Sequence, residues 1–463
     1  MNVKLLMAPI PFSDQRLRKA HINWRPLVCA LAAPFLFATA FATNPLIMDQ
    51  FTADPTARVF EGRIYVYPSH DIPTEPGKGR PGWFCMEDYH VFSSDDLTDW
   101  KDHGVIVSQA NVDWVNSNAY SMWAPDCVFR SGKYYFFFPA IAKAGGFRVG
   151  VAIADKPYGP FKPEAEPIEG VRGIDPCVFI DKDGSAYLYY SAKKIYVGRL
   201  KDSMLALEGT PAVIDNLPTK GLLEGAFVFE RNGIYYLTYP HVENTRERLE
   251  YSTSTHPLGP FQQRGVILDE SPTGCWTVHH SIVEYQGQWY LFYHDKDLSP
   301  DDDKNRSIRA DRLFFDDDGA IKKVVPTLRG VGIVEATSKL QIDRYSAASE
   351  KGATVSFLDR ANPGGGWAIS LQGAGSWVRF DRVLFAESTL NDLIARGVSS
   401  KGGGVEVHLD DKNGPVLGRI SFEKGSEWKI ARTKLEKGPT GLHDIFVTLS
   451  GNATVDVDWI SFE

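Results

Sequence analysis

Residues 174–192 read IDPCVFIDKDGSAYLYYSA: an acidic head at Asp175, a short apolar run, a turn at Gly184 and an aromatic-rich run. Apolar and aromatic runs on either side of a glycine turn are typical of a β-hairpin. The same pattern occurs five times in the chain. The other four copies begin at Ala53, Ala124, Leu223 and Val278 and turn at Gly62, Gly132, Gly233 and Gly287. The sequence therefore predicts five hairpins of one type.

The spacing of the copies indicates how the hairpins are arranged. Their head residues are 72, 49, 49 and 56 residues apart, and they are Asp54, Asp126, Asp175, Glu224 and His280. Such a period has room for a sheet of four strands, which is the blade of a β-propeller. A solenoid would need a shorter and more regular period, and a parallel α/β fold would need amphipathic helices between the strands. We therefore expect an all-β chain with a five-bladed β-propeller over residues 44–335.

Two further segments flank the predicted propeller. Residues 340–463 show alternating strands with turn signals, which suit one β-sandwich of the jelly-roll kind. At the other end, basic residues precede the apolar stretch 26–41, and Ala40-Phe41-Ala42 supplies small residues for a signal peptidase. The stretch is shorter than the ~20 residues of a membrane-spanning helix. We predict a signal peptide over residues 1–42, a secreted or periplasmic protein, and no stable membrane span after cleavage.

Composition narrows the class of partner. With 50 Lys and Arg against 58 Asp and Glu, the net charge is −8, and no long basic run is present. Nucleic acid is therefore not an expected partner. The 12% of aromatic residues suits strands and also the flat faces of sugars. The four cysteines after residue 42 show no CxxC spacing, so we expect buried apolar side chains, with one disulfide as the alternative: Cys85, Cys127, Cys177 and Cys275.

Acidic heads indicate chemistry in the predicted channel. The first strand of each blade lines the centre of a propeller, so the heads of different blades converge there. Carboxylates brought together repel one another, and apolar or glycine heads would be less costly in a purely structural channel. Glycoside hydrolysis needs such a set, with one carboxyl that donates a proton and another that stays ionised. Alignment of the copies on their Val-Phe pairs sets Asp126 later along the strand than Asp175 and Glu224, so Asp126 is the exception.

These motifs resemble glycoside hydrolase family 43, whose members are five-bladed propellers that act with inversion through Asp, Asp and Glu. The matching stretches are ADPT from Ala53, WAPD from Trp123, GIDPCVFIDKDG from Gly173, LLEGAFVF from Leu222 and HHSIVEYQGQWYLFYH from His279. The resemblance implies that Asp54 is the general base, that Glu224 is the general acid, and that Asp175 orients the acid and tunes its pKa. It also implies that Trp123 and Asp126 line the substrate pocket.

The resemblance implies roles for two further positions. A histidine of the fifth blade lies on the channel axis in this family, often near a metal ion or its waters, and His279 or His280 matches it. Arg306 matches a family arginine that reaches the pocket. The alternative for Arg306 is a solvated loop charge beside the acidic run 301–303.

The C-terminal segment resembles carbohydrate-binding modules of family 6. The resemblance implies a structural calcium ion at Gln341, Asp343 and Asp458, although Gln341 stands where the family has an acidic ligand. Asp456 stands where the family has its sugar-binding Asn. Tyr345, Trp367 and Trp377 offer rings for stacking on sugar. The alternative is a sandwich that only packs against the propeller.

The sequence as a whole predicts an exported, inverting glycosidase that acts on an oligosaccharide or polysaccharide and needs no cofactor for catalysis. The expected activity is that of a β-xylosidase or α-L-arabinofuranosidase on plant cell walls. Three alternatives remain open: a galactan- or arabinan-directed enzyme of the same family, a retaining fructan or sucrose hydrolase, and a non-catalytic carbohydrate-binding propeller.

Overall fold

The computed structural model describes residues 43–359, 361–362, 366–386 and 390–463. The predicted signal peptide, residues 1–42, lies outside this part of the chain. Every regular element of the described residues is a β-strand except one short 3₁₀ helix, Gln109–Asn111, so the all-β prediction is confirmed. Within the same residues, no helix has the length and apolar character needed to span a membrane.

Residues 53–313 form five antiparallel sheets in chain order. The first contains β1 (Ala53–Phe60), β2 (Arg63–Asp71), β3 (Met86–Ser94) and β4 (Lys101–Ser108). The second contains β5 (Asp126–Arg130), β6 (Lys133–Ile141), β7 (Phe147–Ala154) and β8 (Lys162–Pro163). The third contains β9 (Ile174–Ile180), β10 (Ala186–Ser191), β11 (Ile195–Leu200) and β12 (Ala212–Val213).

The last two sheets depart from the regular four strands. The fourth contains β13 (Leu222–Leu223), β14 (Phe227–Arg231), β15 (Ile234–Val242), β16 (Glu247–Ser254) and β17 (Gln262–Leu268), and β13 and β14 both pair with β15. The fifth has only three strands, which are β18 (His280–Tyr285), β19 (Gln288–Asp295) and β20 (Ser307–Leu313). Each sheet nevertheless holds one of the five predicted hairpins.

Glycine geometry explains the hairpin turns. The five predicted turn glycines have φ between 78° and 82°, the left-handed region that side chains with a Cβ rarely adopt. In four of the turns the residue before the glycine also has positive φ: Glu61, Ser131, Asn232 and Gln286. Two consecutive positive φ values are typical of the type I′ turn, whose twist matches that of paired strands.

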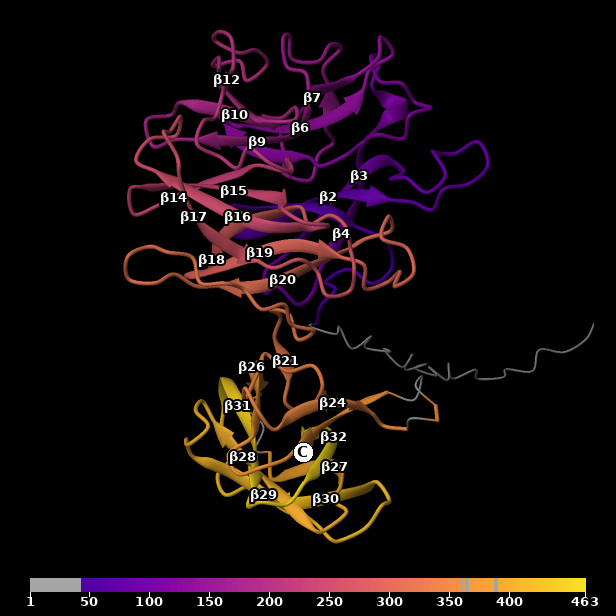
Figure 1. The fold of residues 1–463 in the computed structure, drawn as a ribbon, viewed down its shortest axis with the longest axis vertical. Coiled ribbons are helices and arrows are strands. Elements are labelled where there is room, and N and C mark those ends of the chain that lie inside the picture. The colour runs from indigo at the N-terminus through magenta and orange to yellow at the C-terminus, as the bar shows by residue number, and fades with distance from the viewer. Residues whose placement is uncertain (1–42, 360, 363–365, 387–389) are drawn as a thin grey trace, which may run out of the picture. The chain divides into compact units, whose positions relative to one another are not determined.

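The five sheets form a closed ring, which is the propeller arrangement. The first strands β1, β5, β9, β14 and β18 contact one another in turn, and β18 contacts β1. The first sheet, in indigo, lies beside the last, in orange (Figure 1). The segment before β1 runs along the three-stranded fifth sheet, where the Thr52 amide donates to the Arg306 carbonyl at 2.9 Å and the Leu46 amide to the Ile308 carbonyl at 2.9 Å. The ring brings the heads of the first strands together.

Aromatic side chains of the returning strands fill the spaces inside and between the sheets. Tyr67, Phe136, Tyr189, Tyr236 and Tyr293 are among the largest fully buried side chains. The four cysteines of the described residues are buried and unpaired, as expected for apolar core residues.

Residues 334–462 form two six-stranded sheets, so a β-sandwich is present. One contains β21 (Val334–Glu335), β23 (Ala347–Ala348), β26 (Trp377–Phe385), β28 (Gly403–Leu409), β29 (Val416–Phe422) and β31 (Gly441–Ser450). The other contains β22 (Leu340–Gln341), β24 (Ala353–Phe357), β25 (Trp367–Leu371), β27 (Asp392–Val398), β30 (Lys429–Lys434) and β32 (Val455–Phe462). Its core includes the fully buried Ile369, Val407, Ile445 and Val457.

Candidate active site

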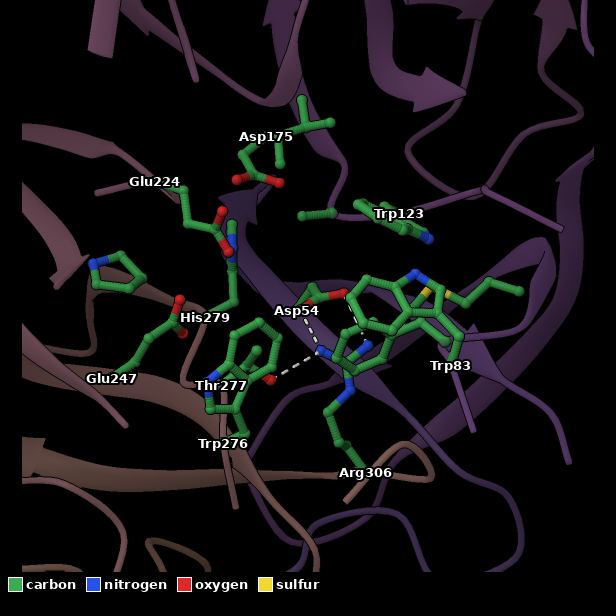
Figure 2. A pocket seen from close by; sticks show the side chains of 15 residues that line it. Asp54, Trp83, Trp123, Asp175, Glu224, Glu247, Trp276, Thr277, His279 and Arg306 are labelled. Carbon is green, nitrogen blue, oxygen red and sulfur yellow. Dashed lines mark hydrogen bonds and ion pairs between the residues drawn. The ribbon is translucent and has the colours of Figure 1, made fainter. Parts of the chain in front are cut away.

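A cavity of about 240 Å³ lies where the heads of β1, β9 and β14 converge. Four carboxyl groups and four aromatic rings dominate its walls (Figure 2). The acidic residues are Asp54, Asp175, Glu224 and Glu247, and the aromatic ones are Trp83, Phe84, Trp123 and Trp276. The remaining lining residues are Met86, Ala124, Ile174, Pro240, Thr277, His279 and Arg306.

The backbone aims two of the carboxyls into the cavity. Asp54 and Asp175 are non-glycine residues with φ of 48° and 54°. Each lies where the register of its hairpin shifts, between Ala53 and Thr56 in β1 and opposite the Tyr189–Ser191 stretch of β10. A bulge of this kind redirects a side chain away from the ladder, and left-handed backbone at a non-glycine residue is costly. The same local distortion at both heads thus places both carboxyls in the pocket.

Asp54 is surrounded by groups that favour its ionised form. Arg306 donates from Nη1 to Oδ1 of Asp54 at 2.8 Å, and the Ser69 hydroxyl donates to Oδ2 at 2.6 Å. The Asp54 amide donates to Nδ1 of His294 at 3.0 Å. Burial by itself would raise the pKa of Asp54, but the charge of Arg306, together with His294, His279 and the Ser69 hydroxyl, lowers this pKa to about 2. Asp54 is a carboxylate throughout the ordinary pH range.

Arg306 is the cation that holds this state. Its side chain is 3% exposed and is shared between Asp54 and Asp71, with Nε donating to Oδ2 of Asp71 at 2.9 Å and Nη2 to Oδ1 of Asp71 at 2.9 Å. The expectation that Arg306 reaches the pocket is therefore correct, and the alternative of a solvated loop charge is wrong. Asp71 is the second carboxyl partner of the buried guanidinium and fixes its orientation toward Asp54. Asp71 was not among the residues predicted from the sequence.

Glu224 lies between two other carboxyls, those of Asp175 and Glu247, and burial raises the pKa of all three groups. Burial raises the pKa of Glu224, and the negative charge of Asp54 adds to this. Burial and the charges of Glu224 and Asp54 raise the pKa of Asp175 well above its usual value. The Gly225 amide donates to Oδ2 of Asp175 at 3.0 Å, which fixes Asp175 beside the backbone of the Glu224 segment. Burial and like-charge repulsion therefore favour the retention of a proton in this set.

Glu247 is the third member of the set and was missed from the sequence. It begins β16, it is 2% exposed, and its Oε2 accepts the Val278 amide at 2.7 Å. Glu247 and Glu224 interact through a side-chain hydrogen bond. Burial and the charge of Glu224 raise the pKa of Glu247 well above its usual value. Figure 2 shows the Glu224 side chain between Asp175 and Glu247, on the side of the pocket opposite Arg306.

Of the two candidate axial histidines, only His279 lines the pocket. His280 is fully buried, and its Nε2 pairs with the Thr238 hydroxyl at 2.6 Å, so its expected place in the pocket is wrong. Burial lowers the pKa of His279 to about 4, so its imidazole is neutral. A neutral imidazole suits the axial metal ion that the family resemblance implies, with His279 as its protein ligand.

The expectation that Asp126 lines the pocket is also wrong. Asp126 is 1% exposed and accepts three hydrogen bonds from Arg58, one from Nε at 3.0 Å and two from Nη2 at 2.8 Å and 2.7 Å. It also accepts the amides of Cys127 and Val178. Asp126 pairs in regular register with Phe137, without the bulge of the other two Asp heads, so its carboxyl points between sheets. Its function is to join β1, β5 and β9.

Aromatic rings form the rest of the wall. Trp123 lines the pocket as expected, and Phe84 packs against both Trp123 and Trp276, with ring centroids 6.1 Å and 6.3 Å apart. Trp83 and Phe84 come from the long connection between β2 and β3, which the sequence could not place. Aromatic faces beside carboxyls are a common way to bind sugar rings, because the apolar face of the sugar stacks on them.

The predicted calcium ligands lie in the sandwich. Gln341 pairs with Trp459, the neighbour of Asp458, across β22 and β32. Burial raises the pKa of Asp343, and the charge of Asp458 contributes, so the two carboxyls are close. Asp458 is however ion-paired with Nη1 of Arg396. A calcium ion at these residues would have to share Asp458 with that guanidinium.

Comparison with known proteins agrees with this fold and site. A propeller with a set of buried carboxyls at its centre has the groups that glycoside hydrolysis requires. Residues 42–321 match Glycosyl hydrolases family 43, and residues 347–463 match Carbohydrate binding module (family 6). Since the first match covers more than half of the chain, this protein belongs to glycosyl hydrolases family 43, and it is a glycoside hydrolase.

Several relatives are similar over most of the propeller or beyond it. Xylosidase/arabinosidase 43A of Humicola insolens is 39% identical in an alignment 327 positions long that covers 60% of this chain and 98% of the relative. An arabinoxylan arabinofuranohydrolase of Bacillus subtilis is 28% identical over 89% of this chain and 90% of its own length. The structure of a family 43 enzyme from Xanthomonas citri complexed with xylose has 36% identity and a TM-score of 0.56, covering 62% of this chain and 94% of that one.

Proposed function

We propose that this protein is an exported, inverting glycosidase that removes xylosyl or arabinofuranosyl units from plant cell-wall polysaccharides. One observation carries the proposal: Arg306 keeps Asp54 ionised, while burial and the charge of Asp54 favour the protonated form of Glu224 in the same pocket. Two carboxyls in opposite protonation states are what glycoside hydrolysis requires. Relatives named for xylosidase and arabinosidase activity support the choice of sugar.

The proposed reaction uses the two carboxyls in one step. Glu224 donates its proton to the glycosidic oxygen as the bond to the anomeric carbon breaks. Asp54 takes a proton from a water molecule that attacks that carbon from the opposite face, so the product has the inverted anomeric configuration. Burial and the charge of Asp54 favour the protonated state of Glu224 between turnovers, and Asp175 and Glu247 are coupled to it through charge. Neither proton transfer needs a cofactor, because both are assigned to carboxyls.

The size of the cavity supports action on a single sugar unit. Its volume of about 240 Å³ is below the ~300–1,000 Å³ of typical ligand pockets. Such a pocket suits a terminal or branching pentose better than the middle of a long chain. This favours the exo-acting or debranching mode.

A panel of nitrophenyl glycosides tests the sugar. We expect hydrolysis of the β-xyloside or the α-L-arabinofuranoside, and proton NMR should show the inverted anomer first. Preference for a galactofuranoside would favour the galactan-directed alternative, and one relative is named a β-D-galactofuranosidase. Retention of configuration would support a fructan or sucrose hydrolase type of mechanism and would remove Asp54 from the role of base. If none of these glycosides is hydrolysed, the result would favour the last alternative, a non-catalytic carbohydrate-binding propeller.

We propose further that the C-terminal module binds polysaccharide through Trp367. This side chain is 45% exposed and stacks on Phe357, with ring centroids 4.3 Å apart. The two rings, with Val355 and Ser356, line a groove of about 400 Å³. Of the other expected platform residues, Tyr345 packs against the sandwich core, and Trp377 packs against Phe446. An exposed aromatic pair is the kind of surface on which a sugar ring stacks.

Calcium binding and export remain predictions. Calcium at Gln341, Asp343 and Asp458 should raise the thermal unfolding midpoint in the presence of CaCl2 relative to EDTA. An unchanged midpoint would mean that Arg396 supplies the cation that Asp458 needs. Export is tested by N-terminal sequencing of the protein released from the producing cell, which should begin at Thr43.

A further inference from the structure

A group of metal-binding side chains lies outside the active site, on the first sheet. His70 on β2 and Asp88 and His90 on β3 each offer one ligand atom, and these atoms lie within 4.8 Å of one another. Among the residues that the structure describes, it is the only group of three His, Cys, Asp or Glu side chains with this geometry. We propose that these three residues form a binding site for a divalent transition-metal ion such as Zn²⁺.

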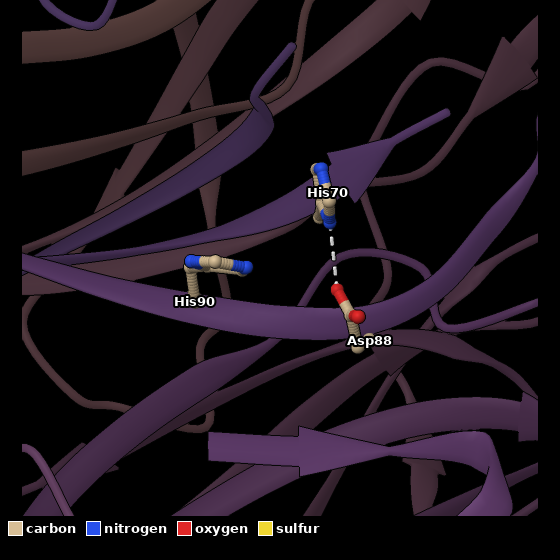
Figure 3. A group of neighbouring side chains, drawn as sticks. All are labelled: His70, Asp88 and His90. Atoms are coloured by element: carbon tan, nitrogen blue, oxygen red, sulfur yellow. Dashed lines mark hydrogen bonds and ion pairs between the residues drawn. The ribbon is translucent and has the colours of Figure 1, made fainter. Parts of the chain in front are cut away.

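The donor set fits that class of ion. Two imidazole nitrogens and one carboxylate oxygen suit Zn²⁺ and its neighbours, whereas Ca²⁺ and Mg²⁺ prefer oxygen ligands only. The rings of His70 and His90 have centroids 4.9 Å apart and are inclined by 71°. Figure 3 shows the His90 ring directed toward the space beside His70 and Asp88. The Nδ1 atom of His70 lies 2.7 Å from Oδ1 of Asp88, and an ion would take the place of the proton that these two atoms share.

A second carboxylate orients the His90 ring. Nδ1 of His90 lies 3.0 Å from both carboxylate oxygens of Asp102 on β4. Asp102 is itself held by the side-chain amide of Gln50 at 3.1 Å and by the Gly104 amide at 2.7 Å. A metal-binding imidazole commonly donates its other N–H to a carboxylate, which fixes the ring and leaves the second nitrogen free for the ion. Asp102 therefore leaves Nε2 of His90 as its ligand atom.

The three ligand side chains are mostly buried, but each keeps some exposure to solvent. The side chains of His70, Asp88 and His90 are 21%, 14% and 14% exposed. An ion can therefore enter from solution. Three protein ligands leave a fourth coordination position for water, as in sites that exchange their ion.

The position of the site suggests that the ion stabilises the first sheet. His70 lies between Ser69 and Asp71 on β2, and these neighbours hold Asp54 and Arg306 on the other side of the strand. None of the three proposed ligands lines the catalytic pocket. An ion that joins β2 to β3 and binds only the folded protein raises the unfolding midpoint by mass action.

The test is a Zn²⁺ titration of the full mature chain without an affinity tag. Isothermal calorimetry should give about one equivalent of bound Zn²⁺, and the unfolding midpoint should rise with Zn²⁺ concentration. We expect His90→Asn and His70→Asn each to weaken binding at least tenfold. Asp102→Asn, which removes only the orienting carboxylate, should weaken it about tenfold. His443→Asn is the matched control, because His443 makes a similar pair with Asp410 at 2.9 Å on the sandwich.

Two outcomes would overturn the proposal. One is the absence of Zn²⁺ binding by the wild-type chain at 100-fold molar excess. The other is wild-type affinity and stoichiometry in His90→Asn. If the histidine variants fail to fold, anomalous scattering at the zinc edge from crystals of the wild-type protein decides instead. A peak between His70 and His90 supports the site, and a peak only elsewhere refutes it.

Discussion

Asp54 and Glu224 are both buried carboxyls, but their surroundings drive them to opposite protonation states. Asp54 faces a guanidinium, a hydroxyl and an imidazole, and its pKa falls to about 2. Glu224 faces other carboxyls, so burial and the charge of Asp54 raise its pKa. The difference arises from a few contacts within one pocket and supports the proposed roles of Asp54 as base and Glu224 as acid.

Removal of the acid should affect substrates according to their leaving group. Glu224→Gln cannot donate a proton, so turnover of natural oligosaccharides should fall by about 10²–10⁴, with a much smaller loss for activated aryl glycosides. Asp54→Asn should be severe for both. Glu284→Gln, at an exposed position on β18, is the control. Turnover of natural substrates by Glu224→Gln within threefold of wild type would place the acid elsewhere.

Asp175, the carboxyl beside Glu224, should affect the alkaline limb of the pH profile. Asp175→Asn removes a like charge next to Glu224, so Glu224 should lose its proton at lower pH. The alkaline limb of kcat/KM should therefore move to lower pH in this variant, while the acidic limb moves less. The profile reports the coupled set rather than single groups. A variant with near-normal activity and an unmoved limb would exclude that residue from the set.

Arg306 should control the acidic limb. In Arg306→Gln the charge that lowers the pKa of Asp54 is gone, so this pKa rises and the base becomes protonated at higher pH. The acidic limb of kcat/KM should move to higher pH. Arg306→Lys retains the positive charge and should move the limb less. If the acidic limb of kcat/KM lies at the same pH in wild type and in Arg306→Gln, another group keeps Asp54 ionised.

At the scale of strands, the side chains of Asp54, Asp126 and Asp175 take different directions because the register of their strands differs at these positions. The bulges in β1 and β9 direct Asp54 and Asp175 into the channel. The regular start of β5 directs Asp126 toward Arg58 on β1 and the Val178 amide on β9. The same residue type at similar repeat positions thus lines the pocket in two sheets and joins neighbouring sheets in a third.

The ion pair between β1 and β5 should contribute to stability rather than to activity. Arg58→Met leaves Asp126 buried without its charge partner, which typically costs about 3–5 kcal/mol. The midpoint of thermal unfolding should fall by several degrees, with kcat/KM little changed at temperatures where the variant is folded. Arg58→Met combined with Asp126→Leu should recover part of the loss. A loss of kcat/KM in the folded variant would return Asp126 to the active site.

At the scale of the whole molecule, the chain combines a propeller pocket, proposed to hold one sugar unit, with a C-terminal module that carries an exposed aromatic pair. The proposed proton transfers take place in the propeller. The proposed sugar surface at Trp367 is on the sandwich, far along the chain from the propeller pocket. The two functions are therefore separable by mutation.

Trp367→Ala should separate polysaccharide binding from hydrolysis. Binding to insoluble xylan or arabinoxylan should weaken, because the stacking surface with Phe357 is lost. Hydrolysis of nitrophenyl glycosides should be unchanged. Pull-down on insoluble polysaccharide measures the first effect, and Val355→Ala, in the same groove, shows how much depends on the ring itself. Equal retention of Trp367→Ala and wild type would assign the module a structural function only.

Several features of this protein were predictable because they are local in sequence. The five hairpins follow from alternating aromatic runs and left-handed glycines at Gly62, Gly132, Gly184, Gly233 and Gly287. Their repeated heads then indicated Asp54, Asp175 and Glu224 as neighbours, because the first strands of a propeller meet at its centre.

Other features depend on contacts between residues far apart in the chain, and only the tertiary structure decided them. Glu247 begins β16, which lies between β15 and β17 and shows no repeat signal in the sequence, yet Glu247 interacts with Glu224. Asp71 ends β2, and its sequence does not mark it as a pocket residue, yet Asp71 binds Arg306. Asp175 lies in the pocket because β9 has a one-residue bulge there, whereas Asp126 begins β5 in regular register and binds Arg58. The composition of the chain does not reveal such a bulge. The sequence by itself determined the architecture and the kind of chemistry, because hairpin patterns are local. The tertiary structure decided which carboxyls share a proton, because protonation depends on the charges and burial that folding brings together.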